Sequence, residues 1–357
     1  MRDRYAKLHD KTTSSGATDR RMCHDSFMSI ARPYKQVDVF SSSPYTGNGL
    51  AVVLDGQGLS DAQMLNFANW TNLAETAFLL PSTHPDADYR VRIFTTTTEL
   101  PFAGHPTLGA AHAWLETGGV PKNPAALIQE CAAGLIEVRR VPGEESTDTE
   151  ALAFKAPPLV RTGALEEDVL EWALGGLGLK REDVLAHQWL ANGPNWAGLL
   201  LRDADLVLSL EPDYVALAGL EVGVIGLHTV GERRAGSYDP AQREQRPAGA
   251  REELRPVSDA DARRSERFGN VVTGAPADYE VRAFCPGEGL QEDPATGSLN
   301  AGFGEWLAGA GLAPESYTVR QGTRLGRAAI LHVNRDASGV WIAGHSVTCI
   351  DGVVNLP

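Results

Sequence analysis

Residues 101–109 read Pro101-Phe102-Ala103-Gly104-His105-Pro106-Thr107-Leu108-Gly109, and a related stretch, Glu292-Asp293-Pro294-Ala295-Thr296-Gly297-Ser298, occurs in the second half of the chain. Similar strand signals precede the two copies, Tyr89-Arg90-Val91-Arg92-Ile93-Phe94 and Tyr279-Glu280-Val281-Arg282-Ala283-Phe284. A helix rich in small residues follows each copy. Because strand, polar turn and buried helix recur in the same order, the sequence predicts a duplicated fold with two half-sites facing each other.

The two helix starts are the first candidates for chemistry. Pro106 and Pro294 each suit the first position of a helix, where the missing proline N–H costs nothing. This places His105 and Asp293 at the cap positions, and aspartate is a favoured N-cap, so a purely structural role for Asp293 stays open. Helix N-termini also attract anions. Two facing helix starts could therefore hold a substrate carboxylate or stabilise an enolate-like intermediate, and the repeat favours this functional interpretation.

Glu75 is the third candidate, because it is a carboxylate on an otherwise apolar strand, residues 74–80. Such a side chain either lies at a solvent-exposed edge or sits in a dry pocket with a raised pKa. The residues alone favour the exposed edge. His112, on the buried helix, and Glu99, near the turn, are expected to have structural roles.

Length and composition predict two domains of the α+β class. The 357 residues, of which 43% are hydrophobic, are enough for two cores. We expect two pseudo-symmetric domains, 35–155 and 156–335, each a curved mixed or antiparallel sheet wrapped around a central helix. The closing strands, 336–357, are expected to return to the first domain.

Two polar stretches interrupt this pattern. Residues 1–34 contain seven Lys/Arg and four Asp/Glu with little apolar periodicity, which predicts a disordered leader. Residues 231–267 contain nine Arg against eight Asp/Glu. A solvated insertion is the favoured interpretation of this second stretch, and a lid or partner-binding loop is the alternative.

Charge and cysteine content exclude several function classes. A net charge of −14 argues against nucleic-acid binding, and no apolar run is long enough to cross a membrane. None of the four cysteines has zinc-ligand spacing, so no metal is expected and a reduced, cytoplasmic location is favoured. Neither a dinucleotide-binding glycine motif nor a P-loop is present.

Three ordered motifs together resemble the phenazine-biosynthesis PhzF-like family, which has the diaminopimelate epimerase-type fold. They are Asn72-Leu73-Ala74-Glu75-Thr76, the stretch 101–109 and the stretch 292–298. The resemblance covers residues from about 35 to 357, excluding 231–267. One departure is Gly47-Asn48-Gly49, where the family usually has Gly-Asn-Pro.

The resemblance implies chemistry without a cofactor in the cleft between the two domains. It implies that Glu75 is the acid/base, supported by His105 and Asp293. Epimerases of this fold use one cysteine at each helix start; here those positions resemble His105 and Asp293, which argues against a two-thiol racemase. The resemblance also implies a homodimer and a set of substrate contacts: Asn48, Gly104, Gly297 and Ser298.

Removing a proton next to a carboxylate or imine requires a base with a pKa near the working pH and donors aimed at the developing charge. The expected function is therefore a cofactor-independent isomerase acting on a small, carboxylate-bearing amino or hydroxy acid, in secondary metabolism. An epimerase or lyase using the same base is one alternative. A small-ligand binding protein that lacks the chemistry is the other.

Overall fold

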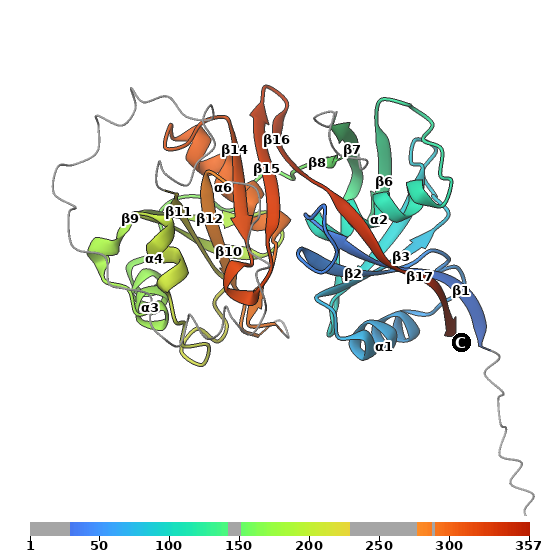
Figure 1. Cartoon of the computed structure of the whole chain (residues 1–357), viewed down its shortest axis with the longest axis horizontal. Coiled ribbons are helices and arrows are strands. Elements are labelled where there is room, and N and C mark those ends of the chain that lie inside the picture. Colours follow the sequence, from blue (N-terminus) through green and yellow to red (C-terminus); the bar gives the residue numbers. More distant parts are fainter. Residues whose placement is uncertain (1–28, 142–150, 229–276, 288–289) are drawn as a thin grey trace, which may run out of the picture.

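The computed structural model describes residues 29–141, 151–228, 277–287 and 290–357 (Figure 1). The predicted leader up to residue 28 and the whole of the predicted insertion 231–267 lie outside the described residues. The predicted α+β class is confirmed: strands of each half wrap around one central helix, and the two halves lie side by side (Figure 1).

The first half runs from residue 30 to residue 155. Its elements are β1 (Ile30–Val39), β2 (Asn48–Val53), α1 (Asp61–Thr71), β3 (Glu75–Leu80), β4 (Tyr89–Phe94), β5 (Glu99–Leu100), α2 (Gly104–Glu116), β6 (Leu127–Cys131), β7 (Gly134–Val141) and β8 (Ala151–Lys155). The central helix α2 packs against β1, β2, β3, β6 and β8.

The second half contains the remaining elements. They are α3 (Glu167–Leu177), a 3-10 turn (Arg181–Asp183), β9 (Val184–Ala191), β10 (Asn195–Leu201), α4 (Ala204–Ser209), β11 (Val222–Leu227), β12 (Tyr279–Phe284), β13 (Glu292–Asp293), α6 (Gly297–Phe303) continued by a π-helical turn (Gly304–Ala308), β14 (Ser316–Gln321), a 3-10 turn (Thr323–Leu325), β15 (Ala329–Asp336), β16 (Gly339–Gly344) and β17 (Ser346–Leu356). The central helix α6 packs against β9, β10, β15 and β16.

The strand pairings repeat between the halves, as expected of a duplication. In each half the first long strand pairs antiparallel with the second, the second parallel with the third, and the third antiparallel with the fourth. The order of neighbouring strands is β1-β2-β3-β4-β6-β7-β8 in the first half and β9-β10-β11-β12-β14-β15-β16 in the second. Antiparallel pairing of β8 with β16 joins the halves and places Phe154 opposite Ile342.

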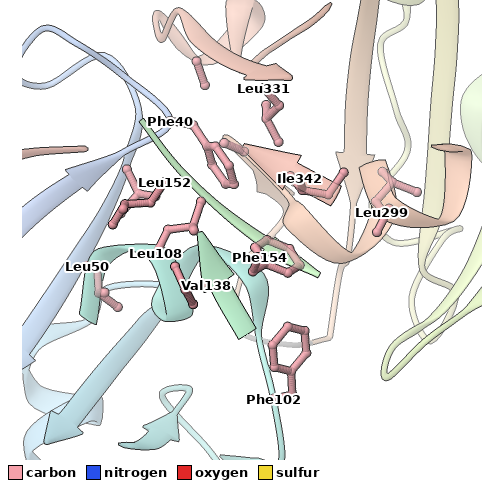
Figure 2. Close-up of a cluster of buried hydrophobic side chains, with 14 of the residues drawn as sticks. Phe40, Leu50, Phe102, Leu108, Val138, Leu152, Phe154, Leu299, Leu331 and Ile342 are labelled. Carbon is pink, nitrogen blue, oxygen red and sulfur yellow. The ribbon is translucent and has the colours of Figure 1, made fainter. Parts of the chain in front are cut away.

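One apolar cluster extends across this junction. Figure 2 shows side chains of both halves packed together around β8. Phe154 is fully buried there and meets Phe102 edge-on, with ring centroids 5.6 Å apart. The labelled members of the cluster are Phe40, Leu50, Phe102, Leu108, Val138, Leu152, Phe154, Leu299, Leu331 and Ile342.

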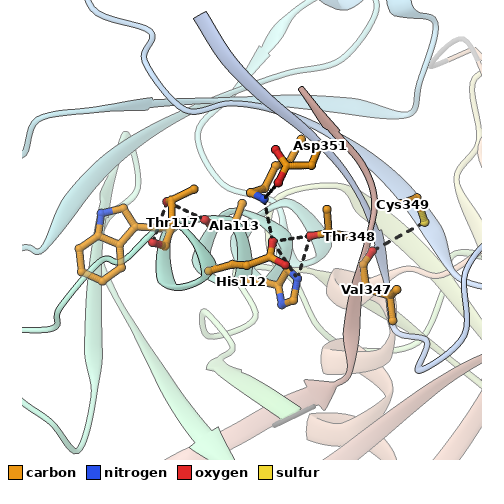
Figure 3. A network of polar contacts seen from close by, with 10 residues as sticks. His112, Ala113, Thr117, Val347, Thr348, Cys349 and Asp351 are labelled. Atoms are coloured by element: carbon orange, nitrogen blue, oxygen red, sulfur yellow. Dashed lines mark hydrogen bonds and ion pairs between the residues drawn. The ribbon is translucent and has the colours of Figure 1, made fainter. Parts of the chain in front are cut away.

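The last strand, β17, leaves the second half and pairs antiparallel with β1 along its whole length (Figure 1). A polar network holds β17 against α2 (Figure 3). Buried Lys35 lies 3.0 Å from Glu116 and 2.7 Å from Asp351, and Thr348 donates to Glu116 at 2.6 Å. The chain end therefore stabilises the first half, although it follows the second half in sequence.

Some boundaries differ from those that the sequence predicts. Strand β1 begins at Ile30, so residues 30–34 belong to the fold and not to the leader, because they pair with the end of β17. Of the closing strands, β17 returns to the first half by pairing with β1, whereas β16 continues the second half by pairing with β15. The capping box of α1 is present, with Ser60 and Gln63 bonded to each other's backbone N–H.

Candidate active site

The starts of the two central helices meet at a pair of glycines. A Cβ on Gly104 would lie 3.1 Å from the Cα of Gly297 and 2.6 Å from Cζ of Phe154, so only glycine permits this approach. The predicted facing of the two helix starts is thus present. The small residues serve first to bring the two backbones together, while both glycines also line a cavity.

The alignment of the two repeats differs from the one that the prolines predict. Phe94 pairs with Glu99 and Phe284 with Glu292, and each glutamate stands five residues before the first helical glycine. His105 therefore corresponds to Ser298, and Asp293 corresponds to Leu100.

The prediction that His105 and Asp293 occupy cap positions was wrong. The N-caps are Ala103 and Thr296, and Pro106 lies inside α2 while Pro294 precedes α6. The reason is that β12 pairs with Asp293 as part of β13, so the helix can begin only after a further turn. The acidic side chain is consequently free for a role other than capping.

A cavity of about 940 Å³ lies between the two halves and contains most of the predicted site. Glu75, Gly104, His105, Asp293, Gly297 and Ser298 all line it. Asn48, by contrast, does not line the cavity. It is buried at the start of β2, where its amide donates to Asp293 Oδ1 at 2.7 Å and to the carbonyl of Ala295 at 3.0 Å. Asn48 thus orients the Asp293 carboxylate without lining the cavity itself.

Glu75 occupies a dry position and not the exposed edge that the residues alone favour. It begins β3, a strand with neighbours on both sides, and only 17% of its side chain is exposed. His105 Nδ1 lies 3.4 Å from Glu75 Oε2. Neither Glu75 Oε2 nor His105 Nε2 has a hydrogen-bond partner in the described part of the chain. A carboxylate oxygen and a ring nitrogen therefore keep hydrogen-bonding capacity that no described residue uses.

Burial sets the ionisation of these groups. It raises the pKa of Glu75 well above its usual value, and the negative charge of Asp293 raises it further. Burial also raises the pKa of Asp293 to about 6, although hydrogen bonds from Thr296, Ala295 and Asn48 oppose this. The pKa of His105 falls to about 3 because the imidazolium would be desolvated, so the ring is neutral at physiological pH.

This arrangement suits proton transfer to and from carbon. A carboxylate with a raised pKa is a stronger base than one in water, and a neutral imidazole can donate one ring N–H to it. Among the described residues, no group of three His, Cys, Asp or Glu side chains is placed to hold a metal ion. No helix in those residues is long and apolar enough to cross a membrane.

The other residues singled out from the sequence lie outside this arrangement. His112 contacts Thr348 through Nε2 at 3.1 Å in the network of Figure 3. Glu99 makes two bonds to Arg92, and Glu292 makes the equivalent pair of bonds to Arg282. The packed and structural roles expected for His112 and Glu99 are confirmed.

The cavity also contains residues that the sequence did not suggest. They include Trp189 on β9, Trp196 on β10 and Asn192 in the turn between these strands. Arg161, which precedes α3, and Cys285, which directly follows β12, also line the cavity. The one local signal was the turn-forming run Asn192-Gly193-Pro194. Their convergence depends on the β9–β10 pairing and on the packing of α6 against it.

Comparison with known proteins identifies the family of the chain. Residues 37–352 match the model of the PhzC–PhzF family, described as phenazine biosynthesis-like proteins. "Antisense-enhancing sequence 1" of Schizosaccharomyces pombe is 33% identical over 330 residues, covering 89% of this chain and 97% of that protein. The trans-2,3-dihydro-3-hydroxyanthranilate isomerase of Pseudomonas chlororaphis is 27% identical, covering 90% and 99%.

Solved structures show the same fold. A PhzF-family protein of Bacillus anthracis superposes with a TM-score of 0.66 at 20% identity, covering 91% of this chain and 99% of that one. A predicted epimerase of Pseudomonas aeruginosa gives 0.63 at 26% identity, covering 90% and 99%. With its duplicated fold and its inter-domain site, this chain belongs to the PhzC–PhzF family and is an isomerase of the PhzF-like type.

Proposed function

We propose that the protein is a cofactor-independent isomerase that moves a proton between carbons of a small amino or hydroxy acid, with Glu75 as the acid/base. The observation that carries the proposal is that Glu75 lines the cavity beside neutral His105, while its buried Oε2 has no hydrogen-bond partner among the described residues. The carboxylate takes a proton from the carbon next to the substrate's acidifying group. The same side chain then returns that proton to a different carbon.

The neighbours of Glu75 have distinct roles in this scheme. His105 lies beside the base, with Nδ1 3.4 Å from Oε2, and because its ring is neutral it adds no positive charge that would lower the pKa of Glu75. Asp293 opposes the ionisation of Glu75 and keeps the base strong. The helix starts at Gly104 and Gly297 offer backbone N–H groups to the charge that develops on the substrate carboxylate.

The test is proton exchange in D2O, with trans-2,3-dihydro-3-hydroxyanthranilate and a pool of cellular amino and hydroxy acids as probes. Wild type should incorporate deuterium or form a new isomer. Replacing Glu75→Gln removes the base but preserves size, and should lower the rate about a thousandfold or more. Glu171→Gln, the same change on the exposed face of α3, should have no effect. Equal rates for wild type and Glu75→Gln would disprove the role of Glu75.

The product distinguishes the proposal from its alternatives. A shifted double bond indicates isomerisation, an inverted centre indicates epimerisation, and loss of a group indicates a lyase. Binding without exchange would indicate a ligand-binding protein. The homodimer also remains a proposal, which light scattering of the purified protein would test.

A further inference from the structure

The Ser298 hydroxyl is oriented by Trp196 on strand β10. Ser298 is the second residue of α6 and lines the cavity, while Trp196 is buried on β10. The indole Nε1–H donates to Ser298 Oγ at 3.1 Å. Because an indole nitrogen can only donate, Oγ is the acceptor in this bond. The proton of the Ser298 hydroxyl is therefore left for another acceptor.

Asn192, in the turn between β9 and β10, anchors the same residue through its backbone. Its Nδ2 donates to the carbonyl oxygen of Ser298 at 2.9 Å. Asn192 lines the cavity and is only 7% exposed. Its Oδ1 is buried and has no hydrogen-bond partner among the described residues. A buried acceptor without a donor is costly, so Oδ1 gains when a ligand supplies an N–H or O–H.

We infer that Asn192, Trp196 and Ser298 form a donor–acceptor subsite that selects acids with an amino or hydroxyl group beside the carboxylate. Ser298 donates its hydroxyl proton to the carboxylate, and Asn192 Oδ1 accepts a proton from the neighbouring group. Trp196 is a positioning residue, because it acts only through Ser298. The inference rests on the proposed function, since it assumes that the substrate occupies this cavity.

Anthranilate and benzoate test the subsite, because they differ only in the amino group next to the carboxylate. Calorimetry should show that wild type binds anthranilate more tightly. Asn192→Leu keeps the size of the side chain without its oxygen, and should reduce the anthranilate-to-benzoate affinity ratio about fivefold or more. An unchanged ratio, or a wild type that binds neither acid, would overturn the inference.

The role of Trp196 is tested by a double-mutant cycle. Trp196→Phe should lower the affinity for both anthranilate and benzoate about fivefold and leave the ratio of the two affinities unchanged. In a Ser298→Ala background the same substitution should cause no further loss of affinity. Trp341→Phe is the matched control, because Trp341 donates to Ser338 Oγ at the same distance of 3.1 Å outside the cavity. A loss that persists in the Ser298→Ala background would show that Trp196 acts only through packing.

Failure of this inference and failure of the proposed function give different results. If wild type exchanges protons through Glu75 but the affinity ratio does not depend on Asn192, the proposed function stands and the subsite is refuted. If no exchange occurs in wild type while the ratio depends on Asn192, the subsite binds an acid and the catalytic proposal is refuted. The thermal unfolding temperature of each variant identifies any loss of fold.

Discussion

At the scale of single residues, burial raises the pKa of two carboxyl groups that line the same cavity. Glu75 and Asp293 lie in one cavity, and the charge on Asp293 raises the pKa of Glu75. Asp293 keeps its hydrogen bonds to Asn48 and Thr296, whereas Oε2 of Glu75 has none among the described residues. Two similar side chains thus have different electrostatic surroundings because their neighbours differ.

The pH dependence of exchange should report this coupling. Exchange requires ionised Glu75, so the rate should fall as the pH drops through its raised pKa. Asp293→Asn removes the neighbouring charge and lowers the pKa of Glu75, so the acidic limb of the pH–rate profile should move to lower pH. The profile is measured with and without the substitution. A limb that stays in place would show that Asp293 does not influence the base.

The same raised pKa predicts a stability change with a defined sign. Below the usual glutamate pKa, Glu75 is protonated in both the folded and the unfolded state. Above that pKa the unfolded state ionises first, so the free energy of unfolding decreases as the pH rises, until the pH passes the raised pKa of the folded state. Glu75→Gln should therefore raise the unfolding temperature at pH 8 but not at pH 4. An equal effect at both pH values would contradict desolvation of this carboxyl group.

At the scale of secondary-structure elements, the duplication has kept one ion pair and changed its surroundings. Arg92 on β4 binds Glu99 on β5, and Arg282 on β12 binds Glu292 on β13 with the same two-bond geometry. The side chains of Arg282 and Glu292 are each 3% exposed, whereas those of Arg92 and Glu99 are 15% and 36% exposed. The second pair fixes the short strand that carries Asp293.

Matched substitutions should separate the two pairs. Arg282→Met leaves a buried carboxylate without its partner and should cost about 3–5 kcal/mol of unfolding free energy. Arg92→Met should cost about 1 kcal/mol or less, because water can solvate the remaining partner. Urea denaturation of both variants provides the comparison. Similar costs would mean that burial does not distinguish the pairs.

At the scale of the whole molecule, the cavity depends on how the halves are joined. Strand β8 belongs to the first half but pairs with β16 of the second, and its Phe154 touches both helix-start glycines. The end of the chain returns from the second half to pair with β1. The position of Glu75 relative to Ser298 therefore depends on contacts that are distant in sequence.

Phe154→Ala should show this dependence. Removing a fully buried ring should cost about 3–5 kcal/mol and also lower the exchange rate, because the helix starts lose their common support. Phe78→Ala is the control: Phe78 is equally buried in the cluster that packs on α1, away from the cavity. It should cost similar stability with little change in the rate per folded molecule. Equal rate losses would rule out a specific role for the junction.

Local patterns were sufficient for the family and the fold class. The strand at residues 89–94 and the helix that follows it in the motif at residues 101–109 depend on neighbours within a few residues, so periodicity and composition reveal them. The role proposed for Glu75 came from the family resemblance, because the residues alone favoured an exposed edge.

The register of the second helix and the environment of each side chain depended on the assembled molecule. Asp293 belongs to a strand because β12 pairs with it. Glu75 is shielded from solvent and not at a sheet edge, since its strand β3 pairs with both β2 and β4. Asn48, Asn192 and Trp196 make hydrogen bonds to residues about 100 or more positions away in sequence. The burial and the pKa of a side chain depend on the groups around it in the folded protein. Those groups come from distant parts of the sequence, so a local sequence pattern does not reveal them.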